Sequence, residues 1–265
     1  MSPLQVVVLA LIQGLTEFLP VSSSAHLILG SWLLGWRDQG LVIDVAIHFG
    51  TLFAVLIYFH RDLREMLGAW KSDPGNPRAA GKRQLGLQIL LASIPVLLAG
   101  AVLHTWVESS LRDVRVIAVS TIFFGLLLWL ADAKFSRQRT IEDMRLQPAL
   151  WIGLAQVAAL IPGASRSGVT MTMGRMLGFS ATASARFSFL LAIPVLAAAG
   201  AYGILRTLQD QASPDWGLFL LAVITSAGAG LVCIGVFLAL LKRVGLVPFV
   251  IYRLGLGAVL VYLAF

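Results

Sequence analysis

The stretch that decides the fold is PLQVVVLALIQGLTEFLPVSSSAHLILGSWLLG, residues 3–35. It is apolar over most of its length, but Glu17, Pro20 and three consecutive serines interrupt it. At membrane depth, non-helical backbone is tolerated only where protein buries it or where it lines a water-filled cavity. The pattern therefore predicts a re-entrant hairpin, in which two helices meet at a polar tip.

A second stretch has the same design: PALWIGLAQVAALIPGASRSGVTMTMGRMLGF, residues 148–179. Here Pro162-Gly163 and the run Ser165-Arg166-Ser167-Gly168 interrupt the apolar residues, and Arg175 follows. We expect a second re-entrant hairpin at this position.

The composition places both hairpins in a membrane. Of the 265 residues, 58% are hydrophobic and 12% are charged, and the mean hydropathy is +0.86. Soluble domains carry about 25% charged residues, so a soluble enzyme, a disordered protein and a nucleic-acid-binding domain are excluded. Cys233 is the single cysteine, which excludes an intrachain disulfide and a cysteine-based zinc site.

Six further segments are long enough to cross a bilayer, which takes about 20 apolar residues. They are residues 41–60, 84–105, 114–132, 182–205, 217–241 and 248–265. The predicted fold is an all-α polytopic membrane protein with six transmembrane helices plus two re-entrant helical hairpins.

The net charge of +7 follows from topology. Six basic residues lie in the 60–84 loop, four lie in the 133–147 loop, and Lys242 and Arg243 lie in one turn. The opposite loops carry only Arg37, Arg112, Arg115 and Arg206. The positive-inside rule puts the first set in the cytoplasm and both termini outside, so no nucleic-acid partner is needed to explain the charge.

The chain forms a single membrane domain, 1–265, that reads as two halves. Residues 1–132 and 148–265 each contain a hairpin followed by three spans. Because each half crosses the membrane three times, an odd number, the second half begins on the opposite side. This predicts an inverted-topology repeat. Such repeats place a binding site near the membrane midplane, where the two tips meet.

The first tip carries Gln13 and Glu17, one helical turn apart, and then Ser22, Ser23, Ser24 and His26. A carboxylate in a membrane is costly unless it is paired or hydrated. Glu17 would either pair with an intramembrane arginine or serve as a metal ligand or acid–base group. The serines would either satisfy turn backbone or supply a nucleophile, with His26 as its base.

The second tip surrounds Arg166 with small and hydroxylic residues: Gly163, Ser165, Ser167, Gly168 and Thr170. Free backbone N–H groups at a helix start and a planar guanidinium both bind phosphate oxygens. We therefore predict a phosphate-binding cradle. The alternative is a purely structural ion pair between Arg166 and Glu17.

The two tips together suit phosphoryl transfer, in which positioning and charge neutralisation carry most of the catalysis. A carboxylate beside phosphates also suggests a divalent cation, Mg²⁺ or Ca²⁺, held by Glu17 and Gln13. Weaker candidates are Arg186 and Arg253, as support behind the phosphates, and His48 near Asp44. We expect His60 and His104 to be solvated at span ends.

These motifs resemble a known family. The run Gln13 to His26 resembles the first signature of the undecaprenyl-diphosphate phosphatases of the bacitracin-resistance type, and Pro162 to Gly168 with Thr170 resembles their second. Residues 187–194 and 248–253 are also similar, so the resemblance spans the chain. Gln13 stands where the family has Glu or Gln, and Ser24-Ala25 stands where Thr-Gly is common.

The resemblance implies a multi-pass enzyme of the bacterial inner membrane with its site facing the periplasm. It would remove the terminal phosphate of undecaprenyl diphosphate with a divalent cation, which recycles the lipid carrier for peptidoglycan. Bacitracin would act on this polyprenyl diphosphate substrate and not on the protein. A homodimer is compatible with the sequence.

Several alternatives stay open at this point. Ser23 or Ser22 would attack the phosphorus, or water would attack directly. A secondary transporter or a polyprenyl-phosphate flippase would use the same midplane site. The second type of membrane phosphatase needs a histidine six residues after its arginine, where this chain has Thr172. Buried Glu, His and Arg argue against a purely structural membrane protein.

Overall fold

A computed structural model describes residues 1–36, 40–73, 75–111, 113–209 and 215–264. Within its helices, it leaves out the side chains of Ser31, His104, Glu108 and Ser109. The predictions for Arg37, Arg112 and the side chain of His104 therefore lie outside the described residues.

The described residues form helices and no strand, apart from one isolated bridge between Arg139 and Phe179. The helices are α1 (Pro3–Thr16), α2 (Ser23–Leu33), α3 (Gly40–Tyr58), α4 (His60–Ala69), α5 (Pro77–Ser110), α6 (Val114–Lys134), η1 (Ile141–Asp143), α7 (Leu146–Ala155), η2 (Gln156–Leu160), α8 (Arg166–Met176), α9 (Ala181–Gln209), α10 (Trp216–Val244) and α11 (Val247–Ala264). The all-α prediction is confirmed.

Six of these helices are long and apolar enough to cross a membrane. They are Gly40–Tyr58, Pro77–Leu103 within α5, Val114–Lys134, Ala181–Gln209, Trp216–Val244 and Val247–Ala264. The six predicted spans therefore each coincide with a helix, and the chain is a multi-pass membrane protein. The observed helices extend beyond several predicted spans because a helix continues past the bilayer as long as polar residues and caps support it.

The region 60–84, predicted as a loop, is largely helical. It holds α4 and the first turns of α5, which Asn76 caps by accepting the N–H groups of Arg78 and Ala79. The Lys82 ammonium lies 2.7 Å from the Glu65 carboxylate, so an ion pair joins the two helices. Hydropathy averaged over the length of a span does not detect α4, because only one face of this helix is apolar and buried.

Both predicted interruptions are breaks between helices. The first, residues 17–22, separates α1 from α2. The second, residues 161–165, follows the 3₁₀ helix η2 and precedes α8. We call these segments, each together with the first turn of the helix that follows it, the first tip and the second tip.

Small residues let the helices beside the first tip pack closely. A Cβ on Gly14 of α1 or on Gly50 of α3 would lie 2.6 Å from atoms of Ser226 or its neighbours on α10. The Ser226 hydroxyl also donates to the Ile47 carbonyl at 2.7 Å. The small-residue run 226–230 is thus a helix-packing face, as small residues commonly are in membrane proteins.

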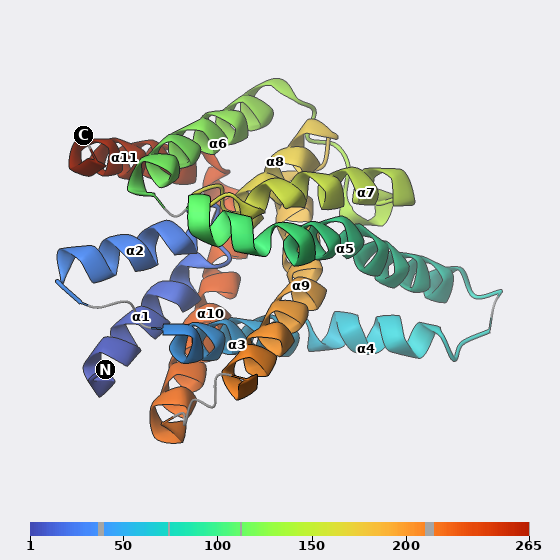
Figure 1. Cartoon of the computed structure of the whole chain (residues 1–265). Coiled ribbons are helices and arrows are strands. Elements are labelled where there is room, and N and C mark those ends of the chain that lie inside the picture. The colour runs from blue at the N-terminus through green and yellow to red at the C-terminus, as the bar shows by residue number, and fades with distance from the viewer. Residues whose placement is uncertain (37–39, 74, 112, 210–214, 265) are drawn as a thin grey trace.

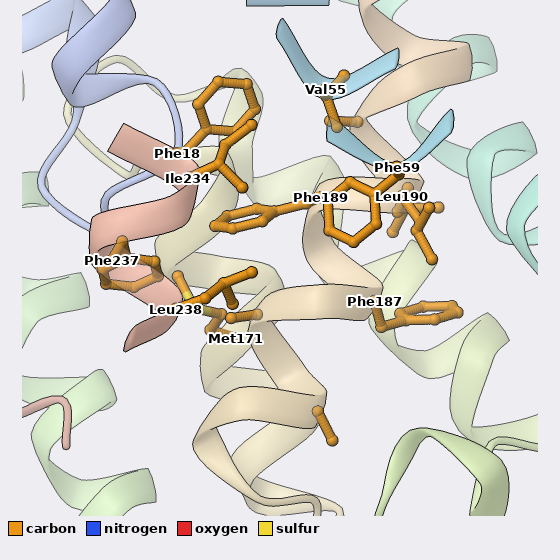
Figure 2. Packing of buried hydrophobic residues seen from close by; sticks show 14 of the residues in the cluster. Phe18, Val55, Phe59, Met171, Phe187, Phe189, Leu190, Ile234, Phe237 and Leu238 are labelled. Carbon is orange, nitrogen blue, oxygen red and sulfur yellow. The ribbon is translucent and has the colours of Figure 1, made fainter. Parts of the chain in front are cut away.

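An aromatic core lies directly behind the tips (Figure 2). Phe18 contacts Phe189 edge to face, with ring centroids 5.3 Å apart, and Phe237 lies 5.9 Å from Phe189. All three rings are buried, and their close van der Waals packing holds the helices together, because lipid offers no hydrophobic driving force between them. Because Phe18 follows Glu17 and Phe189 follows Ser188, this core fixes the backbone of two polar residues at the site.

The overall arrangement places the tips at the centre of the bundle. In Figure 1, α6 and α11 lie side by side above the tips, while α3 and α10 lie below them. The two marked termini are on the left of this view, and the α4–α5 connection is on the right.

Candidate functional site

The two tips share one local geometry. Ser22 and Ser165 are the non-glycine residues of the described chain with positive φ, at 74° and 68°. Each caps the following helix, and its hydroxyl accepts the N–H of the residue three positions later, Ala25 or Gly168. A left-handed conformation is costly for serine and is typical of functional sites, where surrounding structure enforces it.

Each capping serine also pairs with the hydroxyl of the serine two residues after it. The Ser22 and Ser24 Oγ atoms lie 3.1 Å apart, and those of Ser165 and Ser167 lie 3.2 Å apart. The shared Ser-x-Ser pattern thus has the same role at both tips, which is to order the start of a helix.

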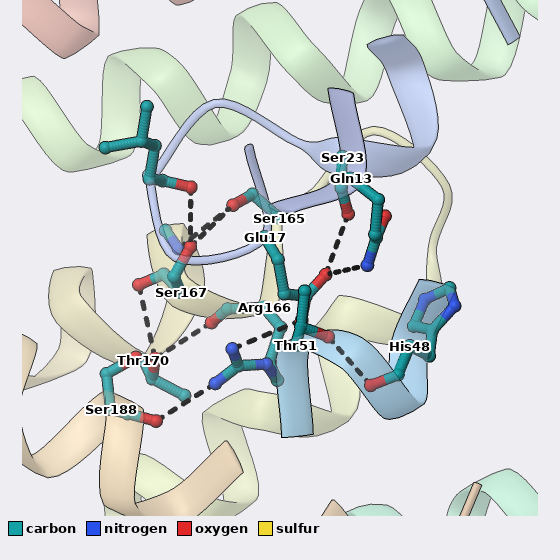
Figure 3. A network of polar contacts seen from close by, with 12 residues as sticks. Gln13, Glu17, Ser23, His48, Thr51, Ser165, Arg166, Ser167, Thr170 and Ser188 are labelled. Atoms are coloured by element: carbon teal, nitrogen blue, oxygen red, sulfur yellow. Dashed lines mark hydrogen bonds and ion pairs between the residues drawn. The ribbon is translucent and has the colours of Figure 1, made fainter. Parts of the chain in front are cut away.

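The first tip brings a hydroxyl onto a carboxylate (Figure 3). The Ser23 hydroxyl donates to Glu17 Oε2 at 3.0 Å, and the Gln13 amide donates to the same oxygen at 2.9 Å. Glu17 lies where α1 ends, and the next helix begins with Ser23. The base in contact with the Ser23 hydroxyl is therefore the Glu17 carboxylate.

The second tip brings a guanidinium to the same carboxylate. Arg166 Nη2 lies 3.3 Å from Glu17 Oε1, and Nη1 donates to the Ser188 carbonyl at 2.9 Å (Figure 3). Arg166 Nε is buried without a hydrogen-bond partner. The ion pair considered from the sequence as the structural alternative does form, and it leaves N–H groups of Arg166, the Nε–H among them, available to an anion.

A small cavity lies between the tips. Its volume is about 160 Å³. Its lining residues are Glu17, Ser22, Ser23, Ser24, Ala159, Ser165 and Arg166. Six of these seven are residues predicted for the site, so the folded chain brings a nucleophile candidate, a base and a cation to one space.

Two predicted phosphate ligands lie behind the cavity. The Ser167 hydroxyl donates to the Leu19 carbonyl at 2.7 Å and so ties the second tip to the first. Thr170 Oγ1 lies 2.8 Å from the Arg166 carbonyl and 2.7 Å from Ser188 Oγ. Both residues are fully buried, and their contacts brace the residues that line the cavity.

The two predicted glycines are needed for space. Gly163 has a φ of +91°, and a Cβ there would collide with the Ser120 hydroxyl. A Cβ on Gly168 would lie 2.6 Å from Nη1 of Arg253. The Gly168 N–H already donates to Ser165 Oγ, so this glycine makes room for the guanidinium of Arg253.

His26 lies outside the residues that line the cavity. Its Nδ1 is 2.7 Å from the Ser22 carbonyl, and its Nε2 is 2.7 Å from the Tyr252 hydroxyl. A carbonyl can only accept, so Nδ1 carries the proton and Nε2 of the neutral ring accepts from Tyr252. Tyr252 also stacks on the imidazole ring, with 4° between the planes.

The weaker candidates lie away from the cavity. Arg186 pairs with Asp62 at 3.0 Å, and the His48 Nδ1 contacts the Asp44 carbonyl at 2.7 Å. His60 is exposed, and its Nδ1 contacts the Ile57 carbonyl at 2.7 Å. None of the three contacts the phosphate cradle.

Three contacts of the site were missed from the sequence. They are the Ser188 carbonyl under Arg166, Ala159 in the cavity wall, and Tyr252 beside His26. Ser188 and Tyr252 lie inside the motifs 187–194 and 248–253, which the family resemblance had pointed to. The residue types could not have indicated the other contacts, because the Ser188 acceptor is a main-chain carbonyl and Ala159 has no polar side chain.

The donor set fits a shared cation better than a closed metal cage. Among the residues that the structure describes, no group of three or more His, Cys, Asp or Glu side chains gathers at one point. Gln13 Oε1 is buried without a partner beside Glu17. Mg²⁺ is commonly held by one or two protein oxygens together with substrate phosphates and water, and Gln13 and Glu17 provide such a pair.

Comparison with known proteins agrees with this geometry. Residues 6–259 match the family model described as bacitracin resistance protein BacA. The chain is 51% identical over 261 residues to "Undecaprenyl-diphosphatase 1" of Pseudoalteromonas translucida (strain TAC 125), covering 98% of each chain. It is 46% identical over 265 residues to "Undecaprenyl-diphosphatase" of Alteromonas mediterranea, covering 100% of each, and 49% identical to that of Chromohalobacter salexigens, covering 97% of each. The chain therefore belongs to the bacitracin resistance protein BacA family.

Proposed function

We propose that this membrane protein is an undecaprenyl-diphosphatase, which hydrolyses undecaprenyl diphosphate to undecaprenyl phosphate and inorganic phosphate. The observation that carries the proposal is the contact set Ser23–Glu17–Arg166 in one cavity. The names of relatives at 46–51% identity over nearly the whole chain support it.

In the proposed reaction, Arg166 binds the terminal phosphoryl group through its free Nε–H and through the Nη2 group that now contacts Glu17. The Ser23 oxygen attacks the terminal phosphorus while its proton passes to Glu17 Oε2, 3.0 Å away. The bond to the bridging oxygen breaks, Glu17 passes its proton to the leaving phosphate oxygen, and undecaprenyl phosphate leaves. Water then attacks the phosphoserine while Glu17 takes a proton from that water. The bond between phosphorus and the Ser23 oxygen breaks, Glu17 returns the proton to that oxygen, and inorganic phosphate leaves.

The other predicted residues take supporting roles. Ser22, Ser24 and Ser165 present hydroxyls to the phosphates, while Ser167, Thr170, Gly163 and Gly168 hold Arg166 and the tips in place. His26 would serve as an acid or base through Nε2 once Tyr252 releases it. A Mg²⁺ or Ca²⁺ ion held by Glu17 and Gln13 would neutralise phosphate charge when bound.

We further propose that the two broken helices are re-entrant hairpins in an inverted repeat. Support comes from the matched geometry of Ser22 and Ser165 and from the three candidate spans that follow each tip. The basic residues of the region 60–84, with both termini on the other side of Figure 1, favour a bacterial inner-membrane orientation with termini and site facing the periplasm. This protein would recycle the lipid carrier for peptidoglycan, and bacitracin would compete for its substrate.

The test is phosphate release from undecaprenyl diphosphate by the purified full chain in detergent, with and without EDTA. Detergent removes any gradient, so a flippase or transporter would release no phosphate. We expect Ser23→Ala to lower kcat on the order of 10³-fold. A matched control is Ser93→Ala, because the Ser93 hydroxyl is buried and bonds only the Ile89 carbonyl of its own helix.

A rapid quench with labelled substrate tests the serine step. A phosphoserine at residue 23 supports the serine nucleophile. If no residue is labelled although phosphate is released, water attacks directly and Ser23 only binds. Phosphate release that persists in Ser23→Ala at the wild-type rate would contradict the site itself.

A further inference from the structure

The guanidinium of Arg253 on α11 lies where the two tips meet, and every N–H it has is used. Nε donates to the Thr121 carbonyl at 3.2 Å. Nη1 donates to the carbonyls of Pro20 at 3.4 Å and Ala164 at 3.0 Å. Nη2 donates to those of Gly163 at 2.9 Å and Ala164 at 3.0 Å. One side chain thus bonds the first tip, the second tip and α6.

Arg253 takes no part in binding the phosphate directly. It is fully buried and does not line the cavity. Among the described residues, no carboxylate lies within ion-pair distance of it. A buried cation without a counter-ion is costly, and here four carbonyl oxygens replace water around it.

We propose that Arg253 is the positioning residue that sets the register between the two halves of the active site. Pro20 lies three residues before Ser23, and Ala164 lies two before Arg166. By fixing both carbonyls, Arg253 fixes the nucleophile relative to the phosphate clamp. This inference rests on the proposed phosphatase function.

The local sequence leaves room for this guanidinium. Gly168 has no Cβ where one would lie 2.6 Å from Nη1, and a Cβ on Gly125 of α6 would lie 3.3 Å from the Cβ of Arg253. Among the described residues, the other bonds between the tips each join one pair: Arg166 Nη2 to Glu17 Oε1 at 3.3 Å, the Ser167 hydroxyl to the Leu19 carbonyl at 2.7 Å, and the Gly163 N–H to Ser24 Oγ at 3.5 Å. Arg253 is thus the residue that ties both tips to a third helix.

Lysine cannot replace this arginine. Its ammonium keeps the charge but has three donors on one nitrogen, so it cannot span four carbonyls arranged around a planar fork. Misplacing reacting groups by about 1 Å can cost on the order of 10²-fold in rate. The expected loss is therefore in kcat, while contacts with the lipid tail and with Arg166 keep KM nearly unchanged.

The first experiment compares Arg253→Lys with Arg175→Lys in the purified full chain. Arg175 is the matched control: it is fully buried on α8, but it pairs with Asp132 at 2.8 Å and bonds the carbonyls of Ser136 and Phe179, away from the tips. We expect Arg253→Lys to lower kcat by about 10- to 100-fold with KM within about threefold. Arg175→Lys should keep kcat within about threefold, whatever its thermal stability.

The second experiment needs no activity. Amide hydrogen exchange should rise in Arg253→Lys at residues 17–25 and 161–168, and in Arg175→Lys at residues 132–140 and 175–181. Wild-type kcat together with unchanged exchange at the tips would overturn the inference. So would a rise spread evenly over the chain, because that reports general destabilisation.

The two experiments separate the two proposals. If the wild-type chain releases no phosphate, the proposed function fails, and exchange at the tips still decides whether Arg253 orders them. If the wild type is active and Arg253→Lys is equally active per folded molecule, only the positioning role fails.

Discussion

The first and second tips have one backbone design and different chemistry. Ser22 and Ser165 share a positive φ and the same cap. The residue that follows is Ser23 at the first tip, on the Glu17 carboxylate, and Arg166 at the second, on the same carboxylate from the other side. The repeated geometry therefore builds the scaffold, and the position after each cap holds the residue that we propose as nucleophile at the first tip and as phosphate clamp at the second.

A second difference lies three positions after each cap. Ala25 stands there at the first tip and Gly168 at the second. The glycine leaves space for the guanidinium of Arg253, which lies closer to the second tip. The two tips are thus not interchangeable, even where their backbones match.

The largest effect should come from removing the charge that the tips share. We expect Glu17→Gln to lower kcat for phosphate release by about 10²- to 10³-fold, because Ser23 loses its base and Arg166 loses its partner. The matched control is Asp132→Asn, which breaks the other buried ion pair, with Arg175. If Glu17→Gln reduced only the amount of folded protein and kept the wild-type kcat per folded molecule, Glu17 would serve folding alone.

The next effect should come from giving the second tip the first tip's residue. Gly168→Ala introduces a Cβ 2.6 Å from Arg253 Nη1, and overpacking of this kind costs about 1–3 kcal/mol of unfolding free energy. We expect lower thermal stability and about tenfold lower kcat, while the reciprocal Ala25→Gly loses about 0.5–1 kcal/mol as a helix glycine and keeps its activity. If Gly168→Ala had the thermal stability and kcat of the wild type, Gly168 would not be needed to make space for Arg253.

A smaller effect should show that the two caps are equivalent in folding. Alanine at Ser22 or Ser165 loses the capping hydroxyl and keeps the strained φ, which we expect to cost about 1–2 kcal/mol. Glycine at either position should cost only a few tenths of a kcal/mol, because it adopts positive φ freely. Thermal melts of the four variants check this, and a large stability difference between the two alanine variants would break the comparison.

The smallest effect should lie in the connection between the halves. The Thr140 N–H and then its hydroxyl donate to the exposed Asp143 carboxylate and hold its pKa below the usual value. A lowered carboxyl pKa stabilises the fold above the ordinary pKa of about 4. We expect Asp143→Asn to lower the melting temperature slightly at pH 7. This difference should shrink below about pH 4 and vanish once the pH is under the lowered pKa; a difference that persists there would contradict it.

The sequence predicted the spans well, because hydropathy over about 20 residues responds to burial in lipid and to little else. It also located both tips, since proline, glycine and serine runs cannot continue an apolar helix. It missed α4, because the hydropathy of this helix, averaged over its apolar and polar faces, is low. Ser23, Glu17 and Arg166, which the sequence singled out as polar residues in apolar stretches, all line the cavity.

Residue type alone could not assign the contacts at the site. From the sequence, His26 is the usual partner of a serine, yet the base that touches Ser23 is Glu17, and His26 bonds Tyr252, 226 positions away. Ser167 and Thr170 were predicted to bind phosphate, but both are buried, and their hydroxyls bond the carbonyls of Leu19 and Arg166. Arg253 read as a weak candidate, and it links both tips.

The sequence by itself determined that this chain lies in a membrane, where its helices run and break, and which family it resembles. These follow from local hydropathy and from motifs of neighbouring residues. Only the tertiary structure decided which side chains share the cavity, which oxygen meets the Ser23 hydroxyl, and that Arg253 bonds the backbone of both tips. Apart from the Ser23–Glu17 contact, which joins residues six positions apart, those facts depend on main-chain carbonyl groups or on residues at least 89 positions apart. The residue types alone do not reveal either.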